Sequence, residues 1–214
     1  SSLPMVSITN DLRAIMSVGV LRFDKVTVVD TTCGQIERFV SPDVATVEDP
    51  TKRIGMVRAM YRQCGIDPTK TRPSSEALLR RLRRGDPFPR INTLVDVCNA
   101  CSVQTLLPYG LYDLDRIIGA VELRLGQQGE AYPGIRKGMV HVEGRPALFD
   151  TDGPFGNPTS DSARTMVTFK TCCVLLVVYA PWLLDHSELR AVLDLTAERV
   201  VNAAGGEESG RWVI

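Results

Sequence analysis

The sequence lacks any apolar run long enough to cross a bilayer as a helix. Such a helix needs about 18 to 20 consecutive apolar residues, whereas the longest apolar stretch here runs only from Cys172 to Pro181. That stretch is rich in valine, which predicts a buried strand. The N-terminus also lacks the basic, apolar and small-residue order of a secretory signal. These absences favour a cytoplasmic protein without a membrane partner.

An excess of charge is absent as well. The 25 basic and 25 acidic residues give a formal net charge of zero, which argues against indiscriminate binding to nucleic acids. One predicted helix nevertheless concentrates positive charge in Arg80, Arg81, Arg83 and Arg84. Two interpretations stay open for this helix, namely contact with nucleic-acid phosphates or a solvated helix face.

Residues for several kinds of chemistry are scarce or wrongly spaced. There are two histidines, predicted to lie at the surface or at a helix cap, and no GxSxG nucleophile motif. Cys98 and Cys101 form a CxxC pair, but no second pair or histidine follows at the spacing of a zinc site. We expect Cys98 and Cys101 to be small buried thiols, and we expect no structural disulfide, Cys33 included, and no metal or cofactor.

Hydrophobic periodicity predicts a single domain of mixed helices and strands over residues 1–214. Helices are expected over 49–64, after 74, from 92 and over 183–204, each with a capping residue or a terminating glycine. Strands are expected over 18–30, 120–125, 139–142, 147–150, 165–171 and 172–181. The strands at 139–142 and 147–150 are expected to pair around a turn at 143–144. We expect a turn at 107–110, a loop at 150–162 and a loosely held tail from 207. The fold class is therefore α/β (α+β), with a mixed sheet flanked by helices.

The segment 72–119 carries an ordered series of motifs, RPSSEALLRRLRRGDPFPRINTLVDVCNACSVQTLLPYGLYDLDRIIG. An arginine-rich helix leads to a proline, an "INTLVD..N" helix, a glycine-bearing turn and a "DLDRIIG" segment. This series resembles the B3/B4 editing domain of the phenylalanyl-tRNA synthetase beta subunit. The resemblance has its core over residues 72–180, whereas residues 1–60 carry no matching motif.

The resemblance implies a hydrolase that deacylates mischarged aminoacyl-tRNA. The aminoacylation motifs of the synthetase are missing, so the activity would be trans-editing. An aminoacyl ester is already activated, so hydrolysis needs positioning, a placed water and oxyanion stabilisation rather than a nucleophilic side chain. The loop Gly153-Pro-Phe-Gly-Asn resembles one wall of the editing pocket. The expected catalytic positions are Gly153, Gly156, Asn157 and Thr168.

Two departures from the synthetase affect the expected substrate. Gly110 stands where the synthetase has a histidine, and Thr168 stands near the position of its pocket glutamate. The loop also contains the carboxylates of Asp150, Asp152 and Asp161, which suit paired hydrogen bonds to a guanidinium-like group. The leading substrate is therefore canavanyl-tRNA for arginine, for which freestanding relatives are a precedent. The alternatives are that these aspartates merely cap backbone amides, that tyrosyl-tRNA for phenylalanine is the substrate, or that the chain is a noncatalytic tRNA-binding module.

Further substrate contacts are expected from the "INTLVD..N" helix and the turn that follows it. Asn92 and Asn99 lie seven residues apart and therefore on one helix face, where they would orient the terminal ribose or the amino group. Capping by Asn92 and a core hydrogen bond from Asn99 are equally open. Tyr109 and Tyr112 would stack on the terminal adenine, with packing as the alternative, which is favoured for Tyr112.

Overall fold

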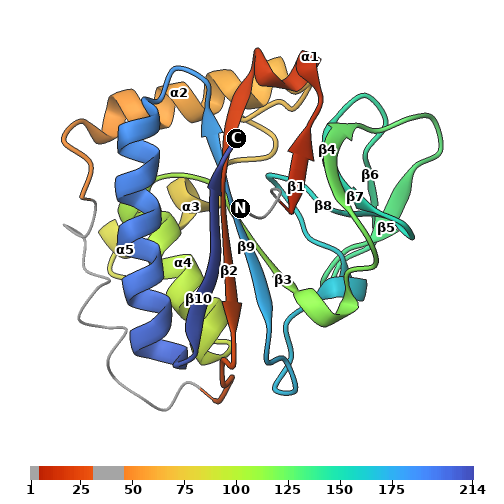
Figure 1. Ribbon diagram of the computed structural model, residues 1–214. Coiled ribbons are helices and arrows are strands. Elements are labelled where there is room, and N and C mark those ends of the chain that lie inside the picture. The colour runs from red at the N-terminus through yellow and green to blue at the C-terminus, as the bar shows by residue number, and fades with distance from the viewer. Residues whose placement is uncertain (1–4, 31–45) are drawn as a thin grey trace.

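The computed structural model describes residues 5–30 and 46–214. Residues 1–4 and 31–45, which include Cys33, lie outside the described residues. The described chain forms two four-stranded sheets and a helical layer (Figure 1), which confirms the predicted α/β class. Over these described ranges, no helix combines the length and hydropathy needed to cross a membrane.

The central sheet is antiparallel, with the order β10-β2-β9-β3. Its strands are β10 (Glu207–Val213), β2 (Met16–Asp24), β9 (Val174–Pro181) and β3 (Tyr109–Asp113). Every residue of β9 is buried. The predicted valine-rich strand is thus confirmed, and it lies between two other strands and is covered on both faces.

The second sheet, which we call the side sheet, has the order β1-β4-β7-β8. Its strands are β1 (Val6–Ile8), β4 (Val121–Leu125), β7 (Pro146–Asp150) and β8 (Gly153–Gly156). Only the β1–β4 pair is parallel. A small hairpin of β5 (Ala131–Pro133) and β6 (Met139–His141) lies beside it. In Figure 1 the side sheet and this hairpin lie on the right of the central sheet.

The helices gather on the opposite side of the central sheet (Figure 1). They are α2 (Pro50–Gln63), α3 (Ser74–Arg83), α4 (Thr93–Thr105) and α5 (His186–Ala204). The short α1 (Asn10–Arg13) is separate from them and contacts β2 of the central sheet and β4 of the side sheet. Helix α5 packs on α4 and on strands β2 and β10, while α4 contacts β3 and α2 contacts β9. One buried apolar cluster joins these helices to both sheets.

Capping residues and a terminating glycine mark the ends of the helices. Asp49 caps α2 by accepting a hydrogen bond from the backbone N–H of Lys52 at 3.0 Å. Gly65 follows α2 with a φ of +76°, a conformation that favours glycine. Asn92 caps α4 through a 2.9 Å hydrogen bond from the backbone N–H of Val95. The predicted helices, the Gly65 stop signal and the capping alternative for Asn92 are confirmed. The cap expected from Ser74 or Ser75 is not, because α3 begins at Ser74 without a side-chain capping hydrogen bond.

Several predictions of local structure were wrong. The tail is strand β10, because the edge of β2 offers it hydrogen-bond partners that its polar sequence does not reveal. Residues 107–110 are not simply a turn, since β3 begins at Tyr109. The loop 150–162 contains β8, and residues 139–150 do not form one hairpin, because β6 pairs with β5 and β7 pairs with β4 and β8.

The strand predicted over 165–171 was also wrong. A 3-10 turn, η3, spans Ala163–Thr165, and a tight turn follows in which the backbone N–H of Thr171 donates to the carbonyl of Thr168 at 3.1 Å. The Thr171 hydroxyl donates to the Asp113 carboxylate at 2.9 Å. Because the threonine hydroxyls form these local hydrogen bonds, the segment adopts turns rather than a strand.

Candidate functional site around Asp161

The loop from β7 to η3 begins with an ion pair. Arg164 donates two hydrogen bonds to the Asp150 carboxylate, both at 2.9 Å, in the paired geometry of a guanidinium and a carboxylate. The backbone N–H groups of Ile118 and Asp152 donate to the same carboxylate at 2.9 Å. Burial alone would raise the pKa of Asp150, but these hydrogen bonds hold it below its usual value. Asp150 is therefore already satisfied within the fold.

The middle of the loop is a turn built by Asn157. Its side-chain carbonyl accepts hydrogen bonds from the backbone N–H groups of Thr159 at 2.9 Å and Ser160 at 2.8 Å. Two tyrosines anchor the same turn, since Tyr61 donates to the carbonyl of Pro158 and Tyr132 donates to the carbonyl of Ser160. The amide of Asn157 thus shapes the loop, as a buried asparagine in a turn commonly does.

The end of the loop brings Asp161 against the edge of the central sheet. The Tyr112 hydroxyl donates to the Asp161 carboxylate at 2.7 Å and lies 3.1 Å from the Tyr179 hydroxyl. The backbone N–H of Leu111, on edge strand β3, also donates to Asp161. Burial raises the pKa of Asp161 to about 7, although the hydrogen bonds from Tyr112 and Leu111 oppose that rise. Asp161 is therefore poised to gain or lose a proton near neutral pH.

Two glycines make room for the Tyr112 ring. A Cβ atom at Gly110 would lie 2.7 Å from the ring carbon that bears the hydroxyl, and a Cβ at Gly156 would lie equally close to that atom. The ring also packs edge-on against Phe155, with centroids 5.1 Å apart. Gly110 and Gly156, which sequence reasoning assigned to substrate binding and to catalysis, thus meet at one side chain. We call Asp161, Tyr112, Tyr179, Gly110 and Gly156 the Asp161 cluster.

The B3/4 domain family matches residues 56–184, more than half of the chain and the whole of the Asp161 cluster. The chain belongs to the B3/4 domain family. A crystal structure of an N-terminal fragment of the phenylalanyl-tRNA synthetase beta-subunit from Pyrococcus horikoshii is similar, with a TM-score of 0.47 and 13% sequence identity. That similarity covers 97% of this chain and 53% of the other, so this chain spans about half the length of the fragment. No curated protein sequence matches.

Other predicted site residues of this B3/4 domain lie in different surroundings. Asn92 caps α4, and Asn99 is half-buried farther along that helix. The Tyr109 hydroxyl lies 2.8 Å from that of Thr196 on α5, which directs the side chain toward the helical layer. Thr168 belongs to the turn before β9, where its hydroxyl accepts from the backbone N–H of Lys170. The structure does not bring these residues into the Asp161 cluster.

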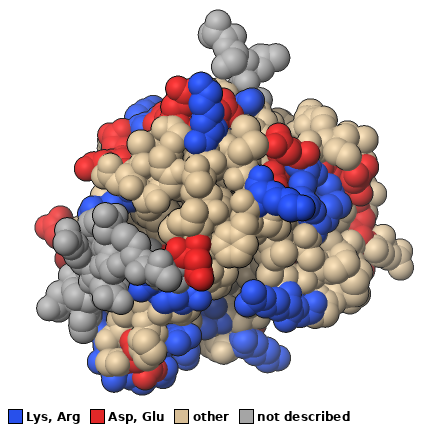
Figure 2. Space-filling model, turned by 90° about the horizontal axis from the view of Figure 1, so that it is seen from below, with Lys and Arg blue, Asp and Glu red and all other residues tan. Residues whose placement is uncertain are grey.

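The arginines of α3 are only partly paired. Arg84 donates to Asp86 at 2.9 Å, and Arg81 donates to the carbonyl of Pro87 at 3.4 Å. Glu76, the nearby acidic residue in sequence, is bound instead by Arg58 of α2 at 2.6 and 2.9 Å. Arg80 and Arg83 are exposed and form no ion pair with any residue in the described ranges. On the face shown in Figure 2, basic and acidic groups are interspersed among uncharged residues.

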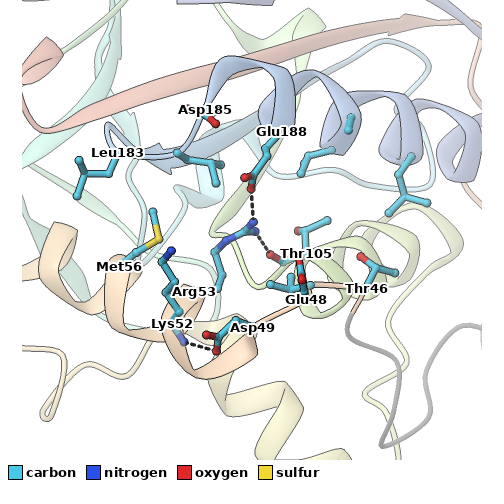
Figure 3. A pocket seen from close by; sticks show the side chains of 15 residues that line it. Thr46, Glu48, Asp49, Lys52, Arg53, Met56, Thr105, Leu183, Asp185 and Glu188 are labelled. Atoms are coloured by element: carbon cyan, nitrogen blue, oxygen red, sulfur yellow. Dashed lines mark hydrogen bonds and ion pairs between the residues drawn. The ribbon is translucent and has the colours of Figure 1, made fainter.

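A cavity of about 780 Å³ lies between the start of α2 and the start of α5 (Figure 3). Arg53, which is 8% exposed, spans its wall and donates to the Thr105 carbonyl at 2.5 Å and to Glu188 at 3.0 Å. Burial lowers the pKa of Arg53, and the Glu188 carboxylate opposes that change. None of the predicted site residues lines this cavity. The sequence gave no signal that α5 covers Arg53, because Glu188 is 135 residues from it.

Proposed function

We propose that this B3/4 domain is a trans-editing hydrolase that deacylates mischarged aminoacyl-tRNA. The observation that carries the proposal is the Asp161 carboxyl, held by the Tyr112 hydroxyl at 2.7 Å beside the glycines of β3 and β8. Its pKa of about 7 suits a group that exchanges protons at neutral pH. The motifs of residues 72–119, which resemble an editing domain, supply the reaction class.

In the proposed reaction a water oxygen attacks the ester carbonyl carbon and gives its proton to the Asp161 carboxylate. The bond between the carbonyl carbon and the ribose oxygen then breaks, and the ribose oxygen receives that proton. Gly153 and Gly156 of β8 are the proposed positions beside the oxyanion, where a backbone without Cβ can approach it closely. The backbone N–H of Asn157 already donates to the Ser160 carbonyl at 3.1 Å, so Asn157 is proposed to shape the loop rather than to donate.

Canavanyl-tRNA for arginine is the proposed leading substrate. A guanidinium-like side chain needs a carboxylate that is not already bound by a guanidinium. Arg164 occupies Asp150 in this way, so the substrate contact is assigned to Asp161 and to the exposed Asp152. Because Asp161 would then both bind the side chain and accept a proton, the two roles must be separated by experiment.

A noncatalytic tRNA-binding module is the second candidate. It is favoured by the position of Tyr112, whose ring fills the space next to Gly110 and Gly156. In this case, the tRNA would be held without hydrolysis. Arg80, Arg81, Arg83 and Arg84 of α3 are the proposed phosphate contacts for either candidate.

Single-turnover deacylation of canavanyl-tRNA for arginine and tyrosyl-tRNA for phenylalanine tests the reaction. We expect faster hydrolysis of the canavanyl ester, and a loss of about 100-fold in rate for Asp161→Asn, as expected for a general base. Asp152→Asn should reduce the ratio of the two deacylation rates, because it removes a contact to the substrate side chain but leaves the proton acceptor Asp161 in place. Asp194→Asn, an exposed carboxylate on α5, is the matched control.

Measurements of tRNA-binding affinity distinguish the noncatalytic module from the hydrolase. Charge reversal at Arg83 and Arg84 should weaken tRNA binding and reduce the salt dependence of log K by about 1 for each lost phosphate contact. Arg13→Glu, on the exposed face of α1, is the control. Binding without turnover of any ester would support the noncatalytic module, and absence of both would refute both candidates.

A further inference from the structure

A second polar cluster lies at the end of the central sheet, outside the Asp161 cluster. Asp115 of the 3-10 turn η2 (Leu114–Arg116) meets Cys172 and Cys173, which precede β9. One ligand atom from each of these residues lies within 4.8 Å of the others, and the Cys172 thiol donates to Asp115 at 3.5 Å. This end of the sheet is at the bottom of Figure 1 and faces the viewer in Figure 2.

Backbone pairing holds the three residues in place. The backbone N–H of Leu114 donates to the carbonyl of Cys173 at 2.9 Å, and the backbone N–H of Val26 donates to the carbonyl of Cys172 at 3.0 Å. The Asp113 side chain accepts from the backbone N–H of Asp115 at 3.1 Å and fixes η2 against the sheet. The backbone at Asp115, Cys172 and Cys173 is therefore held by pairing within the fold.

The surroundings add negative charge. The Asp24 carboxylate at the end of β2 accepts a hydrogen bond from the Cys173 thiol. The Arg22 Nε lies 3.4 Å from a carboxylate oxygen of Asp24, so Arg22 pairs with Asp24 rather than with one of the three ligand residues. Two thiols and two carboxylates thus share one corner, and Asp115 and Cys172 are exposed to solvent. A cation that reached this corner would offset their repulsion once the thiols lose their protons.

We infer that Asp115, Cys172 and Cys173 bind Zn²⁺, with water in the fourth position and Asp24 as an outer carboxylate. Thiolates select thiophilic metals, and zinc combines thiolate and carboxylate ligands in tetrahedral sites. Zinc–sulfur bonds of about 2.3 Å place two sulfur ligands about 3.8 Å apart. Ligand atoms already within 4.8 Å need to move by only about 1 Å. Zinc binding at this site would contradict the expectation from sequence that the chain binds no metal.

A zinc ion here would join η2 to the start of β9 and restrain the turn that contains Thr168. The sequence did not reveal the set, because Asp115 and Cys172 are 57 residues apart and Cys172 and Cys173 are adjacent rather than spaced as CxxC. The site is independent of the proposed hydrolase activity, so either can fail without the other.

Calorimetric titration of the reduced, metal-free protein with Zn²⁺ tests the inference. We expect a single tight site per chain, and an absorption band from thiolate-to-cobalt charge transfer when Co²⁺ replaces zinc. Cys172→Ser and Asp115→Asn should each weaken zinc affinity at least about 100-fold, more than the loss of an outer partner. At a zinc concentration of about 100 times Kd the midpoint temperature should rise by about 5 °C.

Controls separate the site from other thiols and acids. Cys64→Ala removes a buried thiol and Asp194→Asn removes an exposed carboxylate, and both should leave zinc binding unchanged. Since Cys172 and Asp115 are exposed, their variants should retain the circular dichroism spectrum of the parent. Zinc binding that is absent, or that survives both Cys172→Ser and Asp115→Asn, would overturn the inference.

Discussion

The two ends of the loop from β7 to η3 hold their carboxylates in opposite ways. Asp150 faces a guanidinium and two backbone amides, and its pKa falls below the usual value. Asp161 faces the hydroxyl of Tyr112 and one backbone amide, and burial raises its pKa to about 7. Asp150 and Asp161, eleven positions apart in one polar loop, thus have pKa values shifted in opposite directions.

The difference shows which carboxylate suits chemistry. A charge that is fully paired contributes to stability but has no proton to exchange near pH 7. Burial of a carboxyl group among phenol side chains destabilises its charged form, and this raises its pKa toward neutral pH, where proton transfer is useful. We therefore propose Asp150 as a structural group of the loop and Asp161 as the group that takes part in the proposed reaction.

The largest expected effect comes from breaking the Asp150 end. Arg164→Ala leaves the Asp150 carboxylate, whose side chain is 0% exposed, without its counter-ion. Removing one partner of such a pair costs about 3 to 5 kcal/mol. We expect thermal denaturation to show a midpoint lower by about 10 °C for a chain of this size.

Arg84→Ala is the matched control, because its pair with Asp86 is exposed on both sides. An exposed pair contributes about 1 kcal/mol or less. Equal losses of stability in the two variants would contradict the distinction between a framework ion pair and a surface one.

The next effect tests the contact between Tyr112 and Asp161 at the other end of the loop. Gly156→Ala would place a methyl group 2.6 Å from a ring carbon of Tyr112 and force the ring away from Asp161. Overpacking of this kind costs about 1 to 3 kcal/mol, and we expect the loss in urea denaturation together with a lower deacylation rate. Gly55→Ala, on the exposed face of α2 with no atom nearby, should instead stabilise the chain by about 0.5 to 1 kcal/mol.

Much of the fold was predictable because the signals are local. The Asn92 cap, the glycine after α2 and the valines of β9 each depend on residues adjacent in sequence. Strand β10 was missed because its stability comes from pairing with β2, nearly the whole chain away. The threonine-rich segment before β9 was misassigned because its hydroxyls bond to Asp113 and to its own turn.

The site was less predictable than the fold. The resemblance at residues 72–119 led to the correct family and drew attention to Gly110, and the loop at 153–157 drew attention to Gly156. Neither showed that both glycines meet Tyr112. Nothing in the composition of the loop separates Asp150 from Asp161, because the difference depends on Arg164 and on the partner strand β3. The Arg53 cavity depends on Glu188, which is 135 residues from Arg53.

The smallest effect is also the most direct test of the comparison, because it depends on the sign of two pKa shifts. Asp161 binds its proton more tightly when folded, with a pKa of about 7 against about 3.9 for an unfolded aspartate. The stability that it contributes is therefore complete below pH 4 and is lost as the pH rises through 7. The lowered pKa of Asp150 acts in the opposite sense, since its contribution is present above pH 4 and is lost at more acidic pH.

Chemical denaturation at a series of pH values separates these contributions. Between pH 5 and 8, Asp161→Asn should remove a fall in the free energy of unfolding on the order of 1 kcal/mol, because the residue is partly exposed and solvent screens the charge. The same variant should keep the acid-side loss that belongs to Asp150. If the Asn variant showed the parent's full decline between pH 5 and 8, Asp161 would be charged throughout that range, and its assignment to proton transfer would fail with it.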